Sequence, residues 1–129
     1  IGAIPAHKVE HMETACAIRE DKVIHPFAFR THTHALGKVV SGYAVQQDES
    51  GDVWRLLGKK DPQLPQMFYR VEDTAPVRRG DVLAARCLIF LLLECFYSNN
   101  IYLTEFKTLH LNSSKTLELW STSCVNATS

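Results

Sequence analysis

Glycine and proline are missing from the last part of this 129-residue chain. All six glycines and all five prolines lie at or before Gly80, and aspartate is also absent after Asp81. Because β-turns favour glycine and proline, a sheet that continued through this tail would have to turn on other residues. The composition therefore changes near Cys87. We expect a domain over residues 1–87, followed by a tail of different character over residues 88–129.

The chain also lacks an excess of charge, a long apolar run and a basic, apolar leader. Fourteen Lys and Arg balance fourteen Asp and Glu, so nothing predicts binding to nucleic acid or to an anionic membrane. The longest apolar run, from Cys87 to Leu93, is far shorter than the roughly 20 residues of a membrane-spanning helix. We expect a soluble protein without a transmembrane segment. Since the chain opens on Ile1, any signal peptide has been removed or lies upstream.

The four cysteines are widely spaced and form no C-x-x-C pair, which disfavours a zinc ribbon or a thioredoxin-type redox motif. They are Cys16, Cys87, Cys95 and Cys124. An even number at long spacing is typical of two disulfides in an oxidising compartment, and four buried thiols are the alternative. Two N-x-S/T sequons, at Asn112 and Asn126, agree with a glycoprotein that is secreted or resides in a secretory vesicle.

Short stretches rich in β-branched and aromatic residues follow one another up to Cys87. We expect strands at Val23–His34, Leu36–Val45, Val53–Leu57, Gln66–Val71 and Val82–Ile89. The polar stretch 46–52 is expected to be a turn. Leu88–Phe96 fits a buried strand or a short helix, since an apolar run alone does not decide. This spacing predicts an all-β fold, an antiparallel sandwich or barrel.

Two histidines one residue apart lie at the end of residues 27–34, which read FAFRTHTH. On a strand, residues two apart point to the same face, about 6.6 Å apart along the chain. His32 and His34 can therefore approach one metal ion, with Arg30 on the same face. Neutral imidazoles suit copper, zinc, iron or nickel, and two of them leave a site that needs a third ligand. The alternative is a pair of strand histidines without a metal, and the motif alone does not decide.

Other histidines and cations are weaker candidates. His7 and His11 are i, i+4 neighbours if their segment is helical, but they lack the glutamate placement of H-E-x-x-H, which favours ordinary surface residues. His25 lies on the strand of the H-x-H pair and is expected to be structural or to support the ligands. The remaining candidates are one histidine of the tail and two basic pairs that are most simply solvated: His110, Lys59-Lys60 and Arg78-Arg79.

A series of uncommon sequence words resembles peptidylglycine α-hydroxylating monooxygenase, the copper enzyme family of peptide amidation. In order, the stretches read IPAHKVEHMETAC (4–16), KVIHPFAFRTHTH (22–34), LGKVVSGY (36–43), PQLPQ (62–66) and GDVLAARC (80–87). Together they extend over about two-thirds of the chain. The resemblance is closer than that to dopamine β-monooxygenase, which shares mainly the H-x-H-x-x-G core.

The resemblance implies a fold and a chemistry. The family's catalytic core consists of two jelly-roll-like β-sandwich domains, each holding one copper across a solvent-filled cleft. This chain is similar to the second, whose copper binds oxygen beside the substrate. By resemblance, His32 and His34 are copper ligands and Arg30 holds the terminal carboxylate of the substrate peptide, to which a planar guanidinium donates paired hydrogen bonds. The implied reaction is ascorbate-dependent hydroxylation of the Cα of a C-terminal glycine in a glycine-extended peptide.

The resemblance ends at Cys87. The family's third ligand at this copper is a methionine in a downstream D-E-M-C-N-type segment, which is absent here, and Met12 and Met67 are the only methionines. Loss of the thioether is expected to weaken Cu(I) binding. The family's first domain, with its three-histidine copper, is also missing. Cys87 would lose its usual disulfide partner, with Cys95 or Cys124 as substitutes.

We interpret the abrupt change as an alternative ending, from splicing or intron read-through, that leaves the sandwich short of its last strands. The alternative is an extension that completes the sheet in another way. The sequence thus predicts a peptidylglycine monooxygenase by family that is inactive or incomplete alone. One competing hypothesis is a non-catalytic fragment that binds copper or peptide weakly. Another is a cupin-type dioxygenase, but the glutamate that cupins need soon after H-x-H is absent from residues 35–43.

Overall fold

The computed structural model describes residues 2–4, 7–33, 36–90, 95–97, 103–111 and 117–124, with side chains in 7–33 and 36–90. Every regular element in these residues is a β-strand. The strands are β1 (Gly2–Ile4), β2 (Val9–Ala17), β3 (Ile24–His32), β4 (Gly37–Asp48), β5 (Gly51–Lys60), β6 (Tyr69–Arg70), β7 (Val82–Phe90), β8 (Cys95–Tyr97), β9 (Leu103–Leu111) and β10 (Leu117–Cys124). Within the described ranges there is accordingly no helix of the length and apolarity that a membrane crossing requires.

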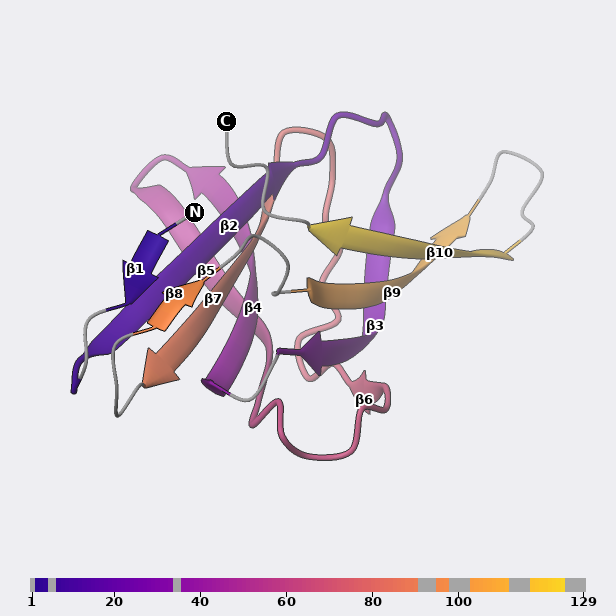
Figure 1. The fold of residues 1–129 in the computed structure, drawn as a ribbon. Coiled ribbons are helices and arrows are strands. Elements are labelled where there is room, and N and C mark those ends of the chain that lie inside the picture. The colour runs from indigo at the N-terminus through magenta and orange to yellow at the C-terminus, as the bar shows by residue number, and fades with distance from the viewer. Residues whose placement is uncertain are drawn as a thin grey trace.

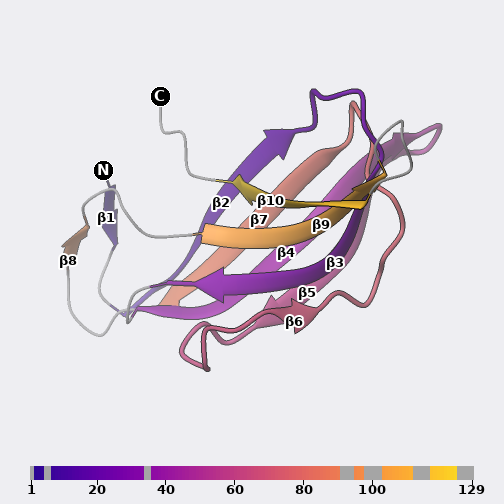
Figure 2. The same cartoon turned by 90° about the vertical axis from the view of Figure 1, so that its right-hand side faces the viewer.

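Two four-stranded antiparallel sheets form the two layers of a sandwich (Figures 1 and 2). The first, called here the β2 sheet, has the strand order β2-β7-β4-β5, and the second, the β3 sheet, has the order β10-β9-β3-β6. A short β1-β8 pair lies beside them. The all-β antiparallel sandwich predicted from the sequence is confirmed.

The core lies between the sheets and contains apolar side chains from both. Phe29 of β3 packs with Ala44, Leu57 and Leu83 of the β2 sheet, together with residues of the connecting segments. Burying each large side chain contributes about 1.5–3 kcal/mol. Gly58 is needed for this packing, because a Cβ at that position would collide with the Phe29 ring. A second buried cluster of Val40, Cys87 and Ile89 continues the core within the β2 sheet.

A β-bulge in β3 decides which of its side chains face the core. The pairing of β3 with β9 shifts between Pro26 and Ala28, so Phe27 is the extra residue of the bulge. Pro26 is fully buried before the bulge, and Phe29 is buried after it. Before Phe27 an even-numbered residue, Pro26, therefore faces the core, and after Phe27 an odd-numbered residue, Phe29, does so. This phase change explains why simple alternation does not fit the whole segment.

The expected strands are present, with different ends. The stretch 46–52, expected to be a turn, is mostly strand, because β4 runs to Asp48 and β5 begins at Gly51. The chain reverses within two residues, where Asp48 Oδ1 accepts hydrogen bonds from the N–H and hydroxyl of Ser50, which also lower the pKa of the Asp48 carboxyl. The strand expected over 66–71 is limited to β6. β2 is a strand, so the helical spacing considered for His7 and His11 does not occur.

The tail contributes strands to the β3 sheet. β9 pairs with β3 along the range from Ile24 to His32, and β10 pairs with β9. This differs from the expectation that the tail leaves the sandwich short, and it agrees with the alternative of an extension that completes the sheet. Between β9 and β10 the sequence reads NSSKT, without glycine or proline. The compositional boundary at Cys87 falls within β7.

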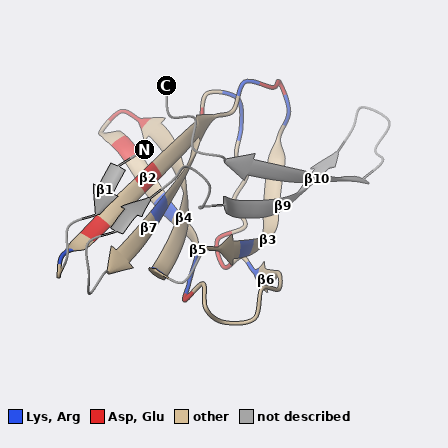
Figure 3. Ribbon diagram, viewed as in Figure 1, with Lys and Arg blue, Asp and Glu red and all other residues tan. Residues whose placement is uncertain are grey.

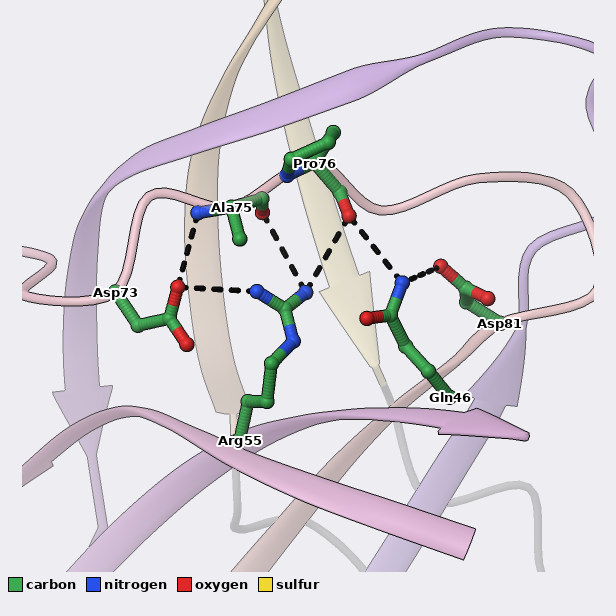
Figure 4. A network of polar contacts seen from close by, with 6 residues as sticks. All are labelled: Gln46, Arg55, Asp73, Ala75, Pro76 and Asp81. Atoms are coloured by element: carbon green, nitrogen blue, oxygen red, sulfur yellow. Dashed lines mark hydrogen bonds and ion pairs between the residues drawn. The ribbon is translucent and has the colours of Figure 1, made fainter. Parts of the chain in front are cut away.

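A polar network attaches the segment before β7 to the β2 sheet (Figure 4). The guanidinium of Arg55 donates to Asp73 Oδ1 at 3.0 Å and to the carbonyl of Pro76 at 3.3 Å. The amide of Gln46 donates to the same carbonyl at 3.3 Å and to Asp81 Oδ2 at 2.6 Å. The segment between β6 and β7 is thereby held against the sandwich, where it contributes two fully buried valines to the core, Val71 and Val77.

We expect Arg55→Met to lower the free energy of unfolding by about 1–3 kcal/mol, because it removes the donors to Asp73 and Pro76 while keeping an aliphatic side chain. Urea unfolding followed by circular dichroism measures the effect. Arg79→Met is the matched control, since Arg79 is exposed in the turn before β7. Equal destabilisation by both substitutions would show that the network has no special role.

Candidate metal centre

Arg30 and His32 lie on the outer face of the β3 sheet, near the end of β3. Phe29, Thr31 and Thr33 are 4%, 4% and 5% exposed, and Phe29 belongs to the core between the sheets. Because side chains alternate along a strand, Arg30 and His32 point the opposite way, and both are partly exposed. The structure thus brings the predicted carboxylate-binding residue and one predicted ligand to the same face. His34, the second predicted ligand, lies outside the described residues.

The guanidinium of Arg30 lies over the ring of Phe68, with 5.4 Å between Arg30 Cζ and the ring centroid. Phe68 directly precedes β6, and β6 pairs with β3 through Tyr69 and Phe29. A cation over an aromatic face is attracted by the ring quadrupole, which restrains the Arg30 guanidinium beside Phe68. Phe68 could not be predicted as a partner of Arg30, because no local signal in the sequence shows that residues 69–70 pair with β3.

The glycine of the H-x-H-x-x-G pattern has a packing role. A Cβ on Gly37 would collide with the side chain of Thr33, which directly follows His32. Only glycine therefore allows the first residue of β4 to approach the end of β3. The carbonyl of Gly37 also accepts a hydrogen bond of 3.3 Å from the side-chain amide of Gln63. The start of β4 is thus held both by its packing against Thr33 and by the hydrogen bond from Gln63.

The described residues supply part of a metal site. Imidazole suits copper, and His32 lies partly exposed on the outer face. No cluster of three or more His, Cys, Asp or Glu occurs among the residues with described side chains. Met12 packs against the buried Val40, Cys87 and Ile89 in the other sheet. Met67 is 55% exposed in the segment that leads to β6. The donor chemistry therefore fits copper, while a third donor is not found in this part of the chain.

The cysteines differ from the expectation of two disulfides. Cys16 is disulfide-bonded, but Cys87 is a free, buried thiol, so naming Cys87 as a disulfide candidate is corrected. The physical reason is its position, since Cys87 faces the core and its partner in the antiparallel register is Met12. Burial raises the pKa of this thiol to about 12. The side chains of Cys95 and Cys124, and the sequons at 112 and 126, lie outside the described residues.

The other candidate residues do not join this site. His11 is exposed on β2, in the opposite sheet, and His7 is exposed before it. His25 lies on β3 before the bulge and is partly exposed. His110 is the register partner of Ile24, at the far end of β3 from His32, and its side chain lies outside the described residues.

Comparison with known proteins identifies relatives over the part of the chain that contains this site. The family model described as copper type II ascorbate-dependent monooxygenase, C-terminal domain, matches residues 1–91. Over 84 residues, the chain is 45% identical to peptidyl-glycine alpha-amidating monooxygenase B of Xenopus laevis. It is 48% identical to the peptidylglycine alpha-amidating monooxygenases of Rattus norvegicus and Mus musculus. Each match covers 65% of this chain but only 8–9% of the relative, so the chain spans less than a tenth of these proteins.

We expect Gly37→Ala to destabilise the fold by about 1–3 kcal/mol, since Thr33 and the β4 backbone must move to accept the methyl group. Chemical denaturation gives the value. Lys38→Ala is the control, because Lys38 is the exposed neighbour. A Gly37→Ala protein as stable as this control would contradict the close approach of β4 to β3.

We expect Cys87 to resist thiol reagents in the folded protein at pH 8. The thiolate is the reactive form, and a pKa of about 12 keeps this thiol neutral. Titration with Ellman's reagent on the chain and on a Cys87→Ala variant isolates this residue. The two proteins should react equally when folded, and the unmodified chain should gain one additional reactive thiol in denaturant. No difference in denaturant would place Cys87 in a disulfide.

Proposed function

Because this chain belongs to the copper type II ascorbate-dependent monooxygenase family and matches its C-terminal domain, we propose that it carries one half of a peptide-hydroxylating site. The substrate would be a peptide with a C-terminal glycine, and the reaction hydroxylation of the glycine Cα. The proposal is supported above all by Arg30 and His32 lying two residues apart on one face of β3. The names of the relatives, which are peptidylglycine amidating monooxygenases, indicate the substrate class.

His32, together with His34, would hold the copper. The metal would supply the redox chemistry of the hydroxylation, with ascorbate as the reductant. His32 is suited to the role because β3 pairs with β9 as far as His32, whose register partner is Leu103. A ligand on a paired strand keeps its direction better than one on a loop.

Arg30 would bind the terminal carboxylate of the peptide. A guanidinium donates two parallel hydrogen bonds to a carboxylate, which fixes the orientation of the bound group as well as its position. In a C-terminal glycine the α-carbon is bonded directly to that carboxyl carbon. Holding the carboxylate at Arg30 therefore limits where the α-carbon can lie, and His32 is only about 6.6 Å further along the strand. Such positioning lowers the entropic part of the barrier.

Phe68 would act on the substrate through Arg30. The guanidinium lies over the Phe68 ring, and this attraction restricts the rotation of a long side chain. The segment between β5 and β6 would thereby help to select the carboxylate terminus.

The alternative is a non-catalytic fragment that binds copper or peptide weakly. It is favoured by the lack of a third donor among the described residues and by the small share of the relatives' length that the chain represents. On either hypothesis we propose a location in the secretory pathway. The disulfide at Cys16 is the supporting observation, because disulfides persist in oxidising compartments.

We expect the chain to bind a glycine-extended peptide weakly but to give little or no hydroxylated product with copper and ascorbate. Arg30→Gln should weaken peptide binding about tenfold, because it removes a charge-assisted pair of hydrogen bonds. His32→Ala should weaken copper binding and leave peptide binding unchanged. Arg79→Gln is the control for the loss of one positive charge at an exposed position.

Calorimetric titration measures both affinities, and mass spectrometry detects the hydroxyglycine product. Turnover equal to that of a complete two-domain enzyme would contradict the proposal that the chain holds only half of the site. Equal peptide affinity in the Arg30→Gln and Arg79→Gln proteins would contradict the role of Arg30 and favour the non-catalytic fragment.

A further inference from the structure

A hollow lies between the sheets, at the edge formed by β5 and β6. β5 is the last strand of the β2 sheet and β6 the last strand of the β3 sheet, so the sandwich is open there. The hollow, called here the β5–β6 groove, has a volume of about 320 Å³. Its apolar floor consists of Leu56, which is exposed, and Tyr69, which is half-buried, with the buried Phe29 and Leu57 behind them in the lining. Its charged rim consists of Lys59, Lys60, Arg70 and Glu72.

The rim carries more positive than negative charge. Three of its four charged side chains are cations, and no ion pair with a carboxylate involves Lys59, Lys60 or Arg70 among the described side chains. Glu72 lies on the same rim without pairing to any of them there. Basic residues are visible around the end of β5 and beside β6 in Figure 3. Like charges held close together repel, and a bound anion would relieve that repulsion.

Lys60 does not have the fully solvated position expected from the Lys59-Lys60 pair. It is partly buried, and its ammonium lies 4.7 Å from the centroid of the Tyr69 ring. The interaction of a cation with an aromatic face keeps the ammonium over the floor of the groove. One positive charge is thereby positioned directly beside an apolar surface, which an ordinary surface lysine does not provide.

The floor is aromatic and continuous with the core. Phe29 and Tyr69 lie with their ring centroids 6.0 Å apart and tilted by 38°. Gly58 also lines the groove, and the Phe29 ring packs directly against it. An apolar floor beneath several cations suits a flat organic anion, whose ring packs on the floor while its oxygens face the rim. The volume lies near the lower limit of about 300 Å³ for pockets that bind small molecules.

We propose that the β5–β6 groove binds a small planar organic anion. Two sources share this chemistry: ascorbate, the reductant in the family's description, and the carboxylate end of a peptide with an aromatic side chain. Phe29 is three residues from His32 on β3, or roughly 10 Å along the strand, so the groove lies near the ligand strand. Only the assignment to ascorbate rests on the proposed function; anion binding itself does not.

The test is an NMR titration of the metal-free 129-residue chain with ascorbate under anaerobic conditions. Saturable shifts are expected at the amides of Gly58, Lys60 and Tyr69. A Lys60→Gln/Arg70→Gln double variant should bind about tenfold more weakly, because two charge-assisted contacts are lost. Tyr69→Leu removes the aromatic floor without changing charge and should also weaken binding. Lys8→Gln/Arg79→Gln is the matched control, since both residues are exposed outside the groove.

Unchanged affinity in the Lys60→Gln/Arg70→Gln protein, with its spectrum still that of a folded chain, would overturn the proposal. Inorganic phosphate binding as tightly as ascorbate would also overturn it, because phosphate uses the charges and not the aromatic floor. A peptide ending in phenylalanine that binds the groove while ascorbate does not would support the anion site and assign it to peptides. The titration uses neither copper nor turnover, so failure of the hydroxylation proposal would leave its result intact.

Discussion

Phe29 packs against Gly58 across the sandwich, and this contact determines the direction of every side chain near the end of β3. The ring can approach β5 only because position 58 has no Cβ. Once Phe29 faces the core, Arg30 and His32 must face outward. Pro26, three residues before Phe29, is also buried, and the extra residue of the bulge, Phe27, allows both side chains to face inward. A contact on the inner face of β3 thus sets the phase in which Arg30 and His32 reach the outer face.

The sequence predicted the features that depend on local pattern. The all-β architecture, most strand positions and the shared face of Arg30 and His32 follow from β-branched runs and from alternation. It could not predict which strands become neighbours, because strand pairing is decided by contacts far apart along the chain. The stacking of Phe68 on Arg30, the β5–β6 groove and the pairing of β3 with β9 all depend on such neighbours. The free thiol at Cys87 likewise follows from its burial, which cysteine spacing does not reveal.

The two regions assigned to binding lie on opposite faces of the same strand and differ in how they are built. At Arg30, one cation is held over one aromatic ring, which favours a single, directed carboxylate. In the β5–β6 groove, several cations surround an apolar floor. This arrangement favours an anion that matches the groove in shape and charge over one held in a single orientation. The connection from β5 through β6 contributes Phe68 to the first and Tyr69 to the second. Two successive residues therefore serve different sites because they point to opposite faces of the sheet.

The pairing of β9 with β3 has a consequence for association between molecules. Without β9, the backbone from Ile24 to His32 would form the edge of the β3 sheet, with unpaired N–H and C=O groups along most of its length. Such an edge is a template for adding a strand from another chain, which leads to aggregation. The residues beyond the family match thus cover this edge of β3, so a segment that supplies none of the proposed ligands shields the strand that carries His32 from pairing with another chain.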